Sequence, residues 1–382
     1  MKPETYAAEW EVLAALLPDG WQDGARTYGA IRWEKGITDP QVLLRVLLMH
    51  VATGLSLKST VERARAQGLA DLSSVALFKR LRNSRRWLAA MSESLFKRSR
   101  WERAANVKTS RVIRAIDATT VEEPGARGTD WRVHYSVTVP ELTCDFYEVT
   151  DPQGGETFQR IPVRKGDLLL GDRGYCHREA VAHVIDRGGD VIVGLNHTSF
   201  PLLGPGRQGF DILAHLRQLK GFEPHSWPVR FAVKTGQGAK AKTKFYRGRL
   251  CAVRKAEMAA ERARAQVRQA KIKKGKRVLD STLESAGYVF VFTSVKRAEL
   301  SLREVLELYR ARWQIELVFK RLKSLLKLGT LPKHRDDSAE AWIQGKLLTA
   351  LLIERLAERS RLFSPWGHDE VWRTQASDKP VA

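Results

Sequence analysis

Residues 308–323 read LYRARWQIELVFKRLK, and their apolar residues recur at the spacing of an amphipathic helix. One stripe of the predicted helix, which spans 301–329, is apolar: Val305, Leu308, Ile315, Phe319, Leu322 and Leu326. The adjacent stripe is polar: Tyr309, Arg312, Glu316, Lys320, Lys323 and Lys327. A carboxylate among cations is also typical of a solvated face with ion pairs one turn apart. The helix by itself therefore leaves its function open.

Two aspartates lie in or directly after apolar runs elsewhere in the chain. Asp117 lies within VIRAIDATTV, residues 112–121, and Asp172 comes directly after LLLG. Carboxylates at the ends of buried strands lie where α/β proteins form active sites, although an aspartate that caps a turn gives the same pattern. With Glu316 they would supply three oxygen ligands, which Mg²⁺ and Mn²⁺ prefer. Two such ions can activate a nucleophile and stabilise a leaving oxygen in phosphoryl transfer.

The order of these residues resembles a known family. Asp117, then GDRGY with Asp172, then Y-x2-R-x3-E-x6-K is similar to the DDE transposases of the insertion-sequence-four family. The four residues that match its YREK signature are Tyr309, Arg312, Glu316 and Lys323. The segments DWRVHYSV and ARWQIELVFKRLK also resemble that family, and the resemblance covers roughly residues 109–360.

The resemblance implies an α/β fold with a ribonuclease-H-like catalytic core, an inserted β-rich domain and an N-terminal helical domain. Asp172 and Glu316 are 144 residues apart, too far for a simple strand–helix connection, which fits an insertion before the last catalytic residue. The predicted boundaries are 1–108 for a helical DNA-binding domain, 109–196 for the first part of the core, 197–295 for the β-rich insertion, 296–365 for the second part of the core with the YREK helix and C-terminal helices, and 366–382 for a tail.

The resemblance also implies roles for the matching residues. Asp117, Asp172 and Glu316 would be the catalytic residues and would bind Mg²⁺ or Mn²⁺, as two ions. The enzyme would cleave DNA at the element ends, and the freed 3′-OH would attack target DNA. The implied DNA-binding residues are Tyr309, Arg312, Lys323, Lys320 and Arg173. Further candidates are Tyr175, Trp131 and His134, although strand packing explains Trp131 and His134 equally well.

The charge of the chain favours a nucleic-acid partner. Lys and Arg number 65 against 43 Asp and Glu, which gives a formal net charge of +22. Nucleic acid is the usual partner of a large basic protein, although a generally basic proteome would raise the charge without any ligand. Residues 55–88 resemble a helix-turn-helix, whose second helix carries Lys79, Arg80, Arg82, Arg85 and Arg86. The solvated basic face of a helical bundle has the same pattern.

Cysteine usage and hydropathy indicate the compartment. Cys144, Cys176 and Cys251 are widely spaced and predict neither a disulfide framework nor a zinc site. No apolar run approaches the ~20 residues that a membrane helix needs, and the N-terminus lacks the pattern of a signal peptide. The expected location is the bacterial cytoplasm, in association with the nucleoid.

These observations predict a transposase that cleaves insertion-sequence ends and transfers the strands into target DNA by a metal-dependent DDE mechanism. Its expected partner is double-stranded DNA, namely the terminal inverted repeats and the target. A homodimer is expected on DNA, because two ends must be paired and cut together. Two alternatives remain: a metal-dependent nuclease that does not join strands, and a transposase-derived DNA-binding protein. The presence of all three carboxylates and the full YREK set argues against the second alternative.

Overall fold

The computed structural model describes residues 10–32, 36–106, 111–125, 130–139, 141–236, 242–273, 275–329, 331–332 and 336–362. The chain forms two compact units. The first comprises Met1–Asn106, Thr120–Trp131 and Lys320–Ala382, and the second comprises Val107–Thr119 and Arg132–Phe319.

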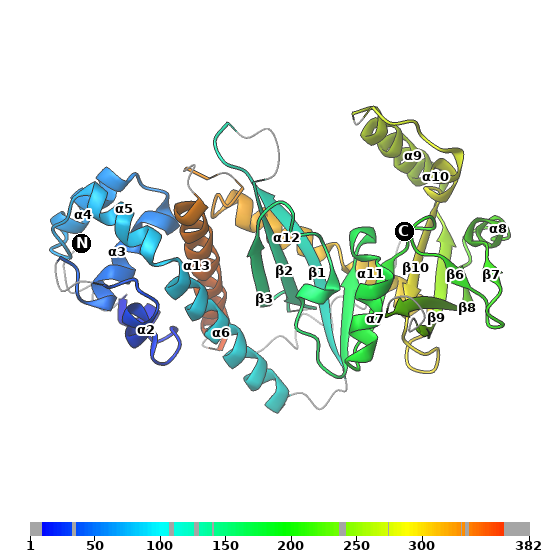
Figure 1. The fold of residues 1–382 in the computed structure, drawn as a ribbon, viewed down its shortest axis with the longest axis horizontal. Coiled ribbons are helices and arrows are strands. Elements are labelled where there is room, and N and C mark those ends of the chain that lie inside the picture. The colour runs from blue at the N-terminus through cyan, green and yellow to red at the C-terminus, as the bar shows by residue number, and fades with distance from the viewer. Residues whose placement is uncertain are drawn as a thin grey trace. The chain divides into compact units, whose positions relative to one another are not determined.

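The described part of the first unit is mainly helical (Figure 1). Its helices are α2 (Trp21–Thr27), α3 (Pro40–Thr53), α4 (Leu57–Ala66), α5 (Ser74–Asn83), α6 (Arg85–Asn106) and α13 (Asp336–Leu362). The Asp39 carboxylate caps α3 by accepting a hydrogen bond from the Gln41 N–H at 2.8 Å, and Ser56 and Ser73 cap α4 and α5 with their hydroxyls. Helix α13 packs against α3, α5 and α6, so the C-terminal helix completes the core of the N-terminal helices.

Among the described residues, the second unit is built on a mixed sheet of ten strands in the order β3-β2-β1-β4-β5-β10-β9-β8-β6-β7. The strands are β1 (Val112–Val121), β2 (Trp131–Thr138), β3 (Cys144–Thr150), β4 (Asp167–Gly171), β5 (Asp190–Gly194), β6 (Leu202–Leu203), β7 (Gly209–Phe210), β8 (His225–Thr235), β9 (Lys242–Arg254) and β10 (Tyr288–Thr293). Strand β4 pairs in parallel with both β1 and β5, whereas β10 pairs antiparallel with β5 and β9. The chain therefore has a mixed α/β fold.

The central strands of this sheet are buried on both faces. Leu169 of β4 belongs to one apolar cluster with Val191 and Phe292, whereas its neighbours Leu168 and Leu170 belong to the cluster on the other side. This alternation follows from the period of two along a strand. The remaining helices of the unit are α7 (Arg178–Asp186), which connects β4 to β5, α8 (Ile212–Arg217), α9 (Glu257–Ile272), α10 (Asp280–Ser285) and α11 (Leu302–Ala311).

Residues 197–295, predicted as a separate β-rich insertion, supply strands β6 to β10 of this same sheet. Strand β10 pairs with β5 through Val291 and Gly194, so the later strands extend the sheet that carries the two aspartates. The division of the chain at residues 196 and 295 stays a prediction.

The predicted single helix over 301–329 is wrong in two respects. Helix α11 ends at Ala311, and α12 (Gln314–Ser324) begins after a tight turn at Arg312 and Trp313. The N–H groups of Ile315 and Glu316 bond to carbonyls three residues earlier, which is the 3₁₀ pattern. Apolar spacing did not reveal the break because Arg312 keeps a helical φ of −50° and ψ of −36°.

The second error concerns the end of that helix. Helix α12 stops at Ser324 rather than Gly329, and Lys327 has a positive φ of 51°. Lys327 therefore does not continue the polar stripe of α12. None of the helices in the described ranges is both long and apolar enough to cross a membrane.

One buried guanidinium joins four neighbouring strands. Arg114 of β1, 3% exposed, lies 2.7 Å from Asp145 of β3 and 3.0 Å from Asp167 of β4. It also donates to the Ser136 hydroxyl of β2 at 3.2 Å and to the Pro162 carbonyl at 2.7 Å. Its positive charge is thus compensated by two buried carboxylates, and Asp117 lies three residues further along the same strand.

We expect Arg114→Ala to lower the free energy of unfolding by about 3–5 kcal/mol, because it leaves two carboxylates buried without their cation. Urea denaturation measures the change. The matched control is Arg160→Ala, whose partly exposed ion pair with Glu148 spans 3.1 Å and should contribute less than about 1 kcal/mol. Equal losses in the two variants would contradict the role of Arg114.

Candidate active site

Asp117 lies in the middle of β1, and Asp172 comes directly after the neighbouring parallel strand β4. In the pairing of β1 with β4, Ala115 lies opposite Leu170, and each aspartate comes two residues later. The Asp172 carboxylate accepts a hydrogen bond from the Gly174 N–H at 2.7 Å and so caps a short 3₁₀ turn. The sheet thus brings together two aspartates that are 55 residues apart in the chain.

The charge of Asp117 is poorly compensated. Burial raises its pKa to about 6, against the lowering effect of a hydrogen bond from the Ala118 N–H at 2.8 Å. Asp172 raises the pKa further, Arg312 lowers it, and Glu156 raises it. Oxygen donors with an excess of negative charge are suited to a hard divalent cation, so this pair of aspartates fits the metal that the DDE pattern implies.

Glu156 is a carboxylate at this site that the sequence analysis missed. Its Oε2 lies 2.3 Å, and the Asp172 Oδ1 lies 3.0 Å, from the position that a Cβ would take on Gly174. Burial and the charge of Asp172 raise the pKa of Glu156, whereas Arg132 and His177 lower it. The only signal in the sequence is a glutamate in the glycine-containing loop GGET before β4.

Tyr175 places a buried hydroxyl near the same carboxylates. The side chain is fully buried, packs on Phe158 with ring centroids 5.2 Å apart, and its hydroxyl has no hydrogen-bond partner among the described residues. Burial raises its pKa, and the charges of Asp117, Glu156 and Asp172 raise it further. The tyrosine therefore stays protonated and can donate a hydrogen bond.

Arg312 lies between the first and last carboxylates of the DDE pattern. Its Nη1 is 3.9 Å from the Asp117 Oδ2, and its Nη2 is 3.8 Å from the Glu316 Oε1. Its Nε is buried and has no hydrogen-bond partner among the described residues. The Asp117 side chain is 18% exposed and that of Glu316 is 63% exposed, so Glu316 faces the solvent side of this guanidinium.

Tyr309 and Arg173 lie beside the end of β5. A Cβ on Gly194 would come 2.2 Å from the Tyr309 hydroxyl and 3.1 Å from the Arg173 Cγ, so glycine is needed there for close packing. Burial raises the pKa of Tyr309, Arg312 and Arg173 lower it, and Asp172 raises it. Two cations and a protonated tyrosine thus border the aspartates.

The structure does not assemble all predicted ligands into one closed metal site. Within the ranges described above, no group of three or more His, Cys, Asp or Glu side chains is close enough to hold a metal ion. Asp117, Asp172 and Glu156 interact electrostatically, whereas Glu316 pairs with Arg312. Lys320 and Lys323 are exposed residues of α12 that belong to the first unit.

His134 and Trp131 make contacts that explain them as packing residues. His134 is fully buried in β2, with its Nε2 3.1 Å from the Thr150 hydroxyl. Burial lowers the pKa of His134 to about 4, and the charges of Arg160 and Arg132 lower it as well. The Trp131 indole N–H donates to the Glu123 carboxylate at 3.1 Å.

Comparison with known proteins identifies the class. Residues 108–352 match the family described as the transposase DDE domain. The InsL protein of insertion sequence element IS186A from Escherichia coli (strain K12) is 32% identical over 362 residues, which cover 93% of this chain and 96% of that protein. The transposase for element IS421 of Escherichia coli is 31% identical over 363 residues, with the same coverage of each chain.

The chain therefore belongs to the transposase DDE domain family and is an enzyme that cleaves and transfers DNA. A cryo-EM structure of the piggyBac transposase synaptic complex with hairpin DNA has a TM-score of 0.40 and 9% sequence identity, over 96% of this chain and 82% of that one. Similarity at that level supports no conclusion about this chain.

The pKa of Asp117 predicts a pH-dependent stability. Its folded pKa of about 6 exceeds the unfolded value of about 3.9, so the stabilisation from proton binding is complete below about pH 4 and is lost as the pH rises through 6. In EDTA, wild type should lose about 2–3 kcal/mol relative to Asp117→Asn between pH 4 and pH 8. Urea denaturation at each pH measures this difference.

The same experiment tests the fit to a metal. At pH 8, Mg²⁺ should stabilise the wild type more than Asp117→Asn, because a ligand that binds only the folded state stabilises it. Asp280→Asn, a change at an exposed aspartate of α10, serves as the control. Parallel pH profiles for wild type and Asp117→Asn would refute the assignment.

Proposed function

We propose that this transposase is a member of the insertion-sequence-four family in which Asp117, Asp172 and Glu316 are the catalytic residues. The observation that carries the proposal is the pair of aspartates that follow the paired residues Ala115 and Leu170 of parallel strands β1 and β4, with Arg312 between Asp117 and Glu316. Two aspartates on a mixed sheet, followed by a glutamate on a later helix, support a ribonuclease-H-like core. The domain boundaries given above are part of this proposal.

Asp117 and Asp172 would hold a divalent ion, Mg²⁺ or Mn²⁺, and Glu316 would complete the ligands of a two-ion site. When bound, such ions activate the attacking oxygen and stabilise the leaving oxygen at a phosphodiester. The poorly compensated charge of Asp117 and the exposed position of Glu316 suit that role. Glu156 adds a further carboxylate next to Asp172.

The surrounding cations would bind the phosphates of the DNA. The buried Nε of Arg312 has no acceptor among the described residues, and a phosphate oxygen would supply one. Tyr309 is protonated and can donate to a phosphate, while Arg173 brings a second guanidinium. We assign the exposed Lys320 and Lys323 to the same task.

The substrates would be double-stranded DNA, first the terminal inverted repeats and then the target. A homodimer would pair the two ends, and the enzyme would act in the bacterial cytoplasm at the nucleoid. Transposase relatives that match almost the full length of the chain favour a joining enzyme over a nuclease or a DNA-binding derivative.

The catalytic role of Glu316 is tested with labelled DNA of the element ends in Mg²⁺, Mn²⁺ or EDTA. We expect Glu316→Gln to lower the rate of metal-dependent nicking by more than about 100-fold, because a charged group at the reacting centre is lost. Binding of the ends in EDTA should remain. Glu307→Gln, a change at an exposed glutamate of α11, is the matched control and should cleave normally.

The products of this assay separate the candidate functions. Joined products in the wild type identify a strand-transferring enzyme, and nicks without joining identify a nuclease. Full cleavage by Glu316→Gln would eliminate this residue from the catalytic set.

The role of Arg312 is tested by the salt dependence of DNA binding in EDTA. Arg312→Ala should weaken binding of the ends and reduce the slope of log K against log [salt] by about 0.9, since one phosphate contact is lost. Arg310→Ala, a change at an exposed neighbour on α11, controls for the general loss of positive charge. A slope that stays the same in Arg312→Ala would show that this guanidinium does not contact phosphate.

A further inference from the structure

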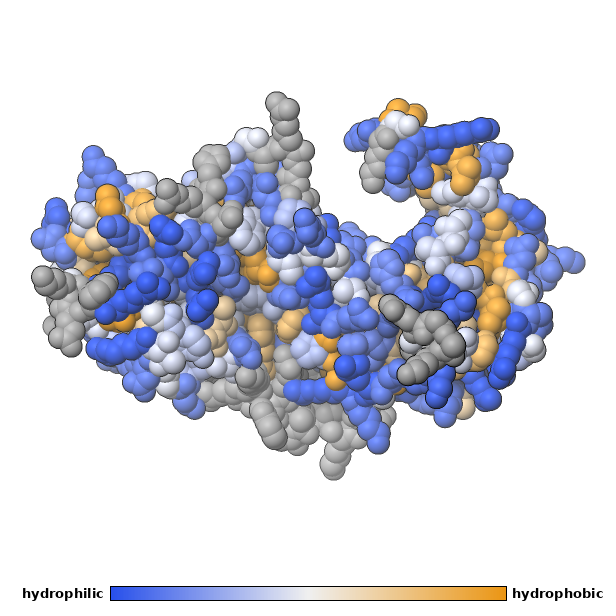
Figure 2. Space-filling model, viewed as in Figure 1, coloured by the Kyte–Doolittle hydropathy of each residue, from blue (hydrophilic) through white to orange (hydrophobic). Residues whose placement is uncertain are grey.

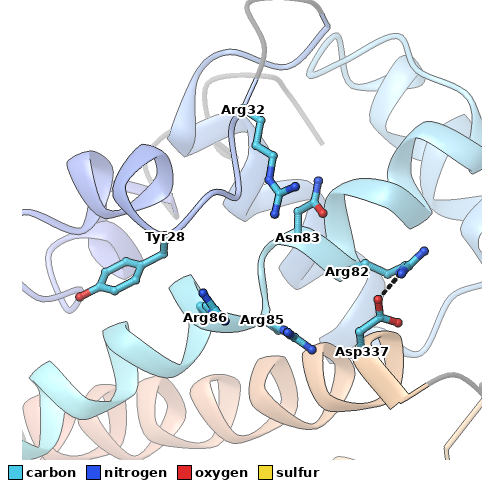
Figure 3. Close-up of a pocket in the computed structure, with 7 residues that line it drawn as sticks. All are labelled: Tyr28, Arg32, Arg82, Asn83, Arg85, Arg86 and Asp337. Carbon is cyan, nitrogen blue, oxygen red and sulfur yellow. Dashed lines mark hydrogen bonds and ion pairs between the residues drawn. The ribbon is translucent and has the colours of Figure 1, made fainter.

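The first unit has a concentration of positive charge of its own. Its residues lie on other segments of the chain than Asp117, Asp172 and Glu316. A cavity of about 300 Å³ is lined by four arginines, with Asn83, Asp337 and Tyr28 (Figure 3). The arginines are Arg32, Arg82, Arg85 and Arg86. We name this cavity the arginine pocket.

Two of the four guanidinium groups are compensated by carboxylates of α13. Arg82 forms an ion pair with Asp337, with the Arg82 Nε 2.6 Å from Oδ2. Although burial raises the pKa of Asp337, the bond with Arg82 brings it below its usual value. Arg85 lies 3.3 Å from Glu340. These two ion pairs connect α13 to the arginines of α5 and α6 on one side of the pocket.

The other two guanidinium groups have no carboxylate partner in the described part of the chain. Arg32 donates from Nε to the Gly29 carbonyl at 3.1 Å, and its guanidinium lies over Gly29, which has a positive φ of 75°. Arg86 is exposed and makes no hydrogen bond or ion pair within the described ranges. The pocket therefore keeps an excess of positive charge with free donors.

Hydrogen bonds at Ser84 order the backbone beside the pocket. Arg82 and Asn83 end α5, Arg85 and Arg86 begin α6, and only Ser84 separates the two helices. Ser84 is fully buried, and both its N–H and its hydroxyl bond to the Arg80 carbonyl, at 3.0 and 2.8 Å. The backbone that carries these arginines is thus ordered before any ligand binds, which reduces the entropic cost of binding.

We propose that the arginine pocket binds a phosphate group of the DNA backbone and anchors the C-terminal end of α5 on the duplex. Guanidinium groups present planar pairs of donors that match phosphate oxygens, and Asn83 adds an amide donor. Figure 2 shows hydrophilic residues gathered where α5 meets α6. The inference rests on the proposed function only in that DNA is the ligand.

An anchor at this point would orient the exposed face of α5. Val75, 64% exposed, and exposed Lys79 lie one turn apart on that helix, and Arg82 follows after three more residues. A phosphate contact fixes position, whereas the face next to it can read the bases. The connection from α4 to α5 runs from Gln67 to Ser73, which is longer than the 3–4-residue turn of a standard helix-turn-helix.

The experiment uses the full chain in EDTA, so that cleavage does not interfere, and measures binding of element-end DNA as a function of salt. Arg86→Ala and Arg32→Ala should each weaken binding about tenfold and reduce the salt slope by about 0.9. Arg26→Ala, a change at an exposed arginine of α2 outside the pocket, should do neither. Arg86→Lys keeps the charge, so it should retain the slope while losing part of the affinity.

The outcomes distinguish this inference from the catalytic assignment. Unchanged affinity and slope in both Arg86→Ala and Arg32→Ala would overturn the phosphate site, even if Glu316→Gln abolishes cleavage as expected. Inorganic phosphate is tested at constant ionic strength as the alternative ligand. If both variants lose binding of inorganic phosphate but bind DNA like the wild type, the pocket recognises a free anion and the inference is wrong. Circular dichroism of each variant confirms that it is folded.

Discussion

The buried guanidinium of Arg114 is the interaction on which the sheet depends near Asp117 and Asp172. It joins β1 to β4 through Asp167 and reaches β3 through Asp145, with both carboxylates and the arginine almost fully buried. A buried ion network is costly unless every member is paired, and here two carboxylates, a hydroxyl and a carbonyl satisfy one guanidinium. Strands β1 and β4 are thereby held in the register that puts Asp117 beside Asp172.

Strand β1 carries two charged residues, Arg114 and Asp117, in different electrostatic environments. At Arg114 two buried carboxylates share one guanidinium, whereas three residues later burial raises the pKa of Asp117 to about 6 and the charge of Asp172 raises it further. Burying like charges close together is unfavourable, and such clusters are typical of functional sites. The arginine pocket of the first unit is the opposite case. Arg82 and Arg85 pair with carboxylates there, whereas Arg32 and Arg86 have no carboxylate partner among the described residues. One site suits cations and the other suits phosphate.

The turn between α11 and α12 has a direct consequence for the positions of Tyr309, Arg312 and Glu316. A straight helix would keep Tyr309, Arg312 and Glu316 on one stripe. The 3₁₀ turn at Arg312 instead leaves its guanidinium between Asp117 and Glu316, while Tyr309 packs over Gly194 at the end of β5. The positions of these side chains depend on the sheet beneath them as much as on helical spacing.

The sequence by itself determined the class of protein, because the order and spacing of its candidate carboxylates and of Tyr309, Arg312, Glu316 and Lys323 resemble a transposase pattern. It also indicated a helical N-terminal part, and apolar runs indicated the strands around Asp117 and Asp172. Only the tertiary structure decided the break at Arg312, the approach of Glu156 to Asp172 and the completion of the arginine pocket by Asp337 of α13. The break at Arg312 is a local turn that apolar spacing does not reveal. The other two features arise between separate segments of the chain, where strand pairing and helix packing, rather than local periodicity, set the distances.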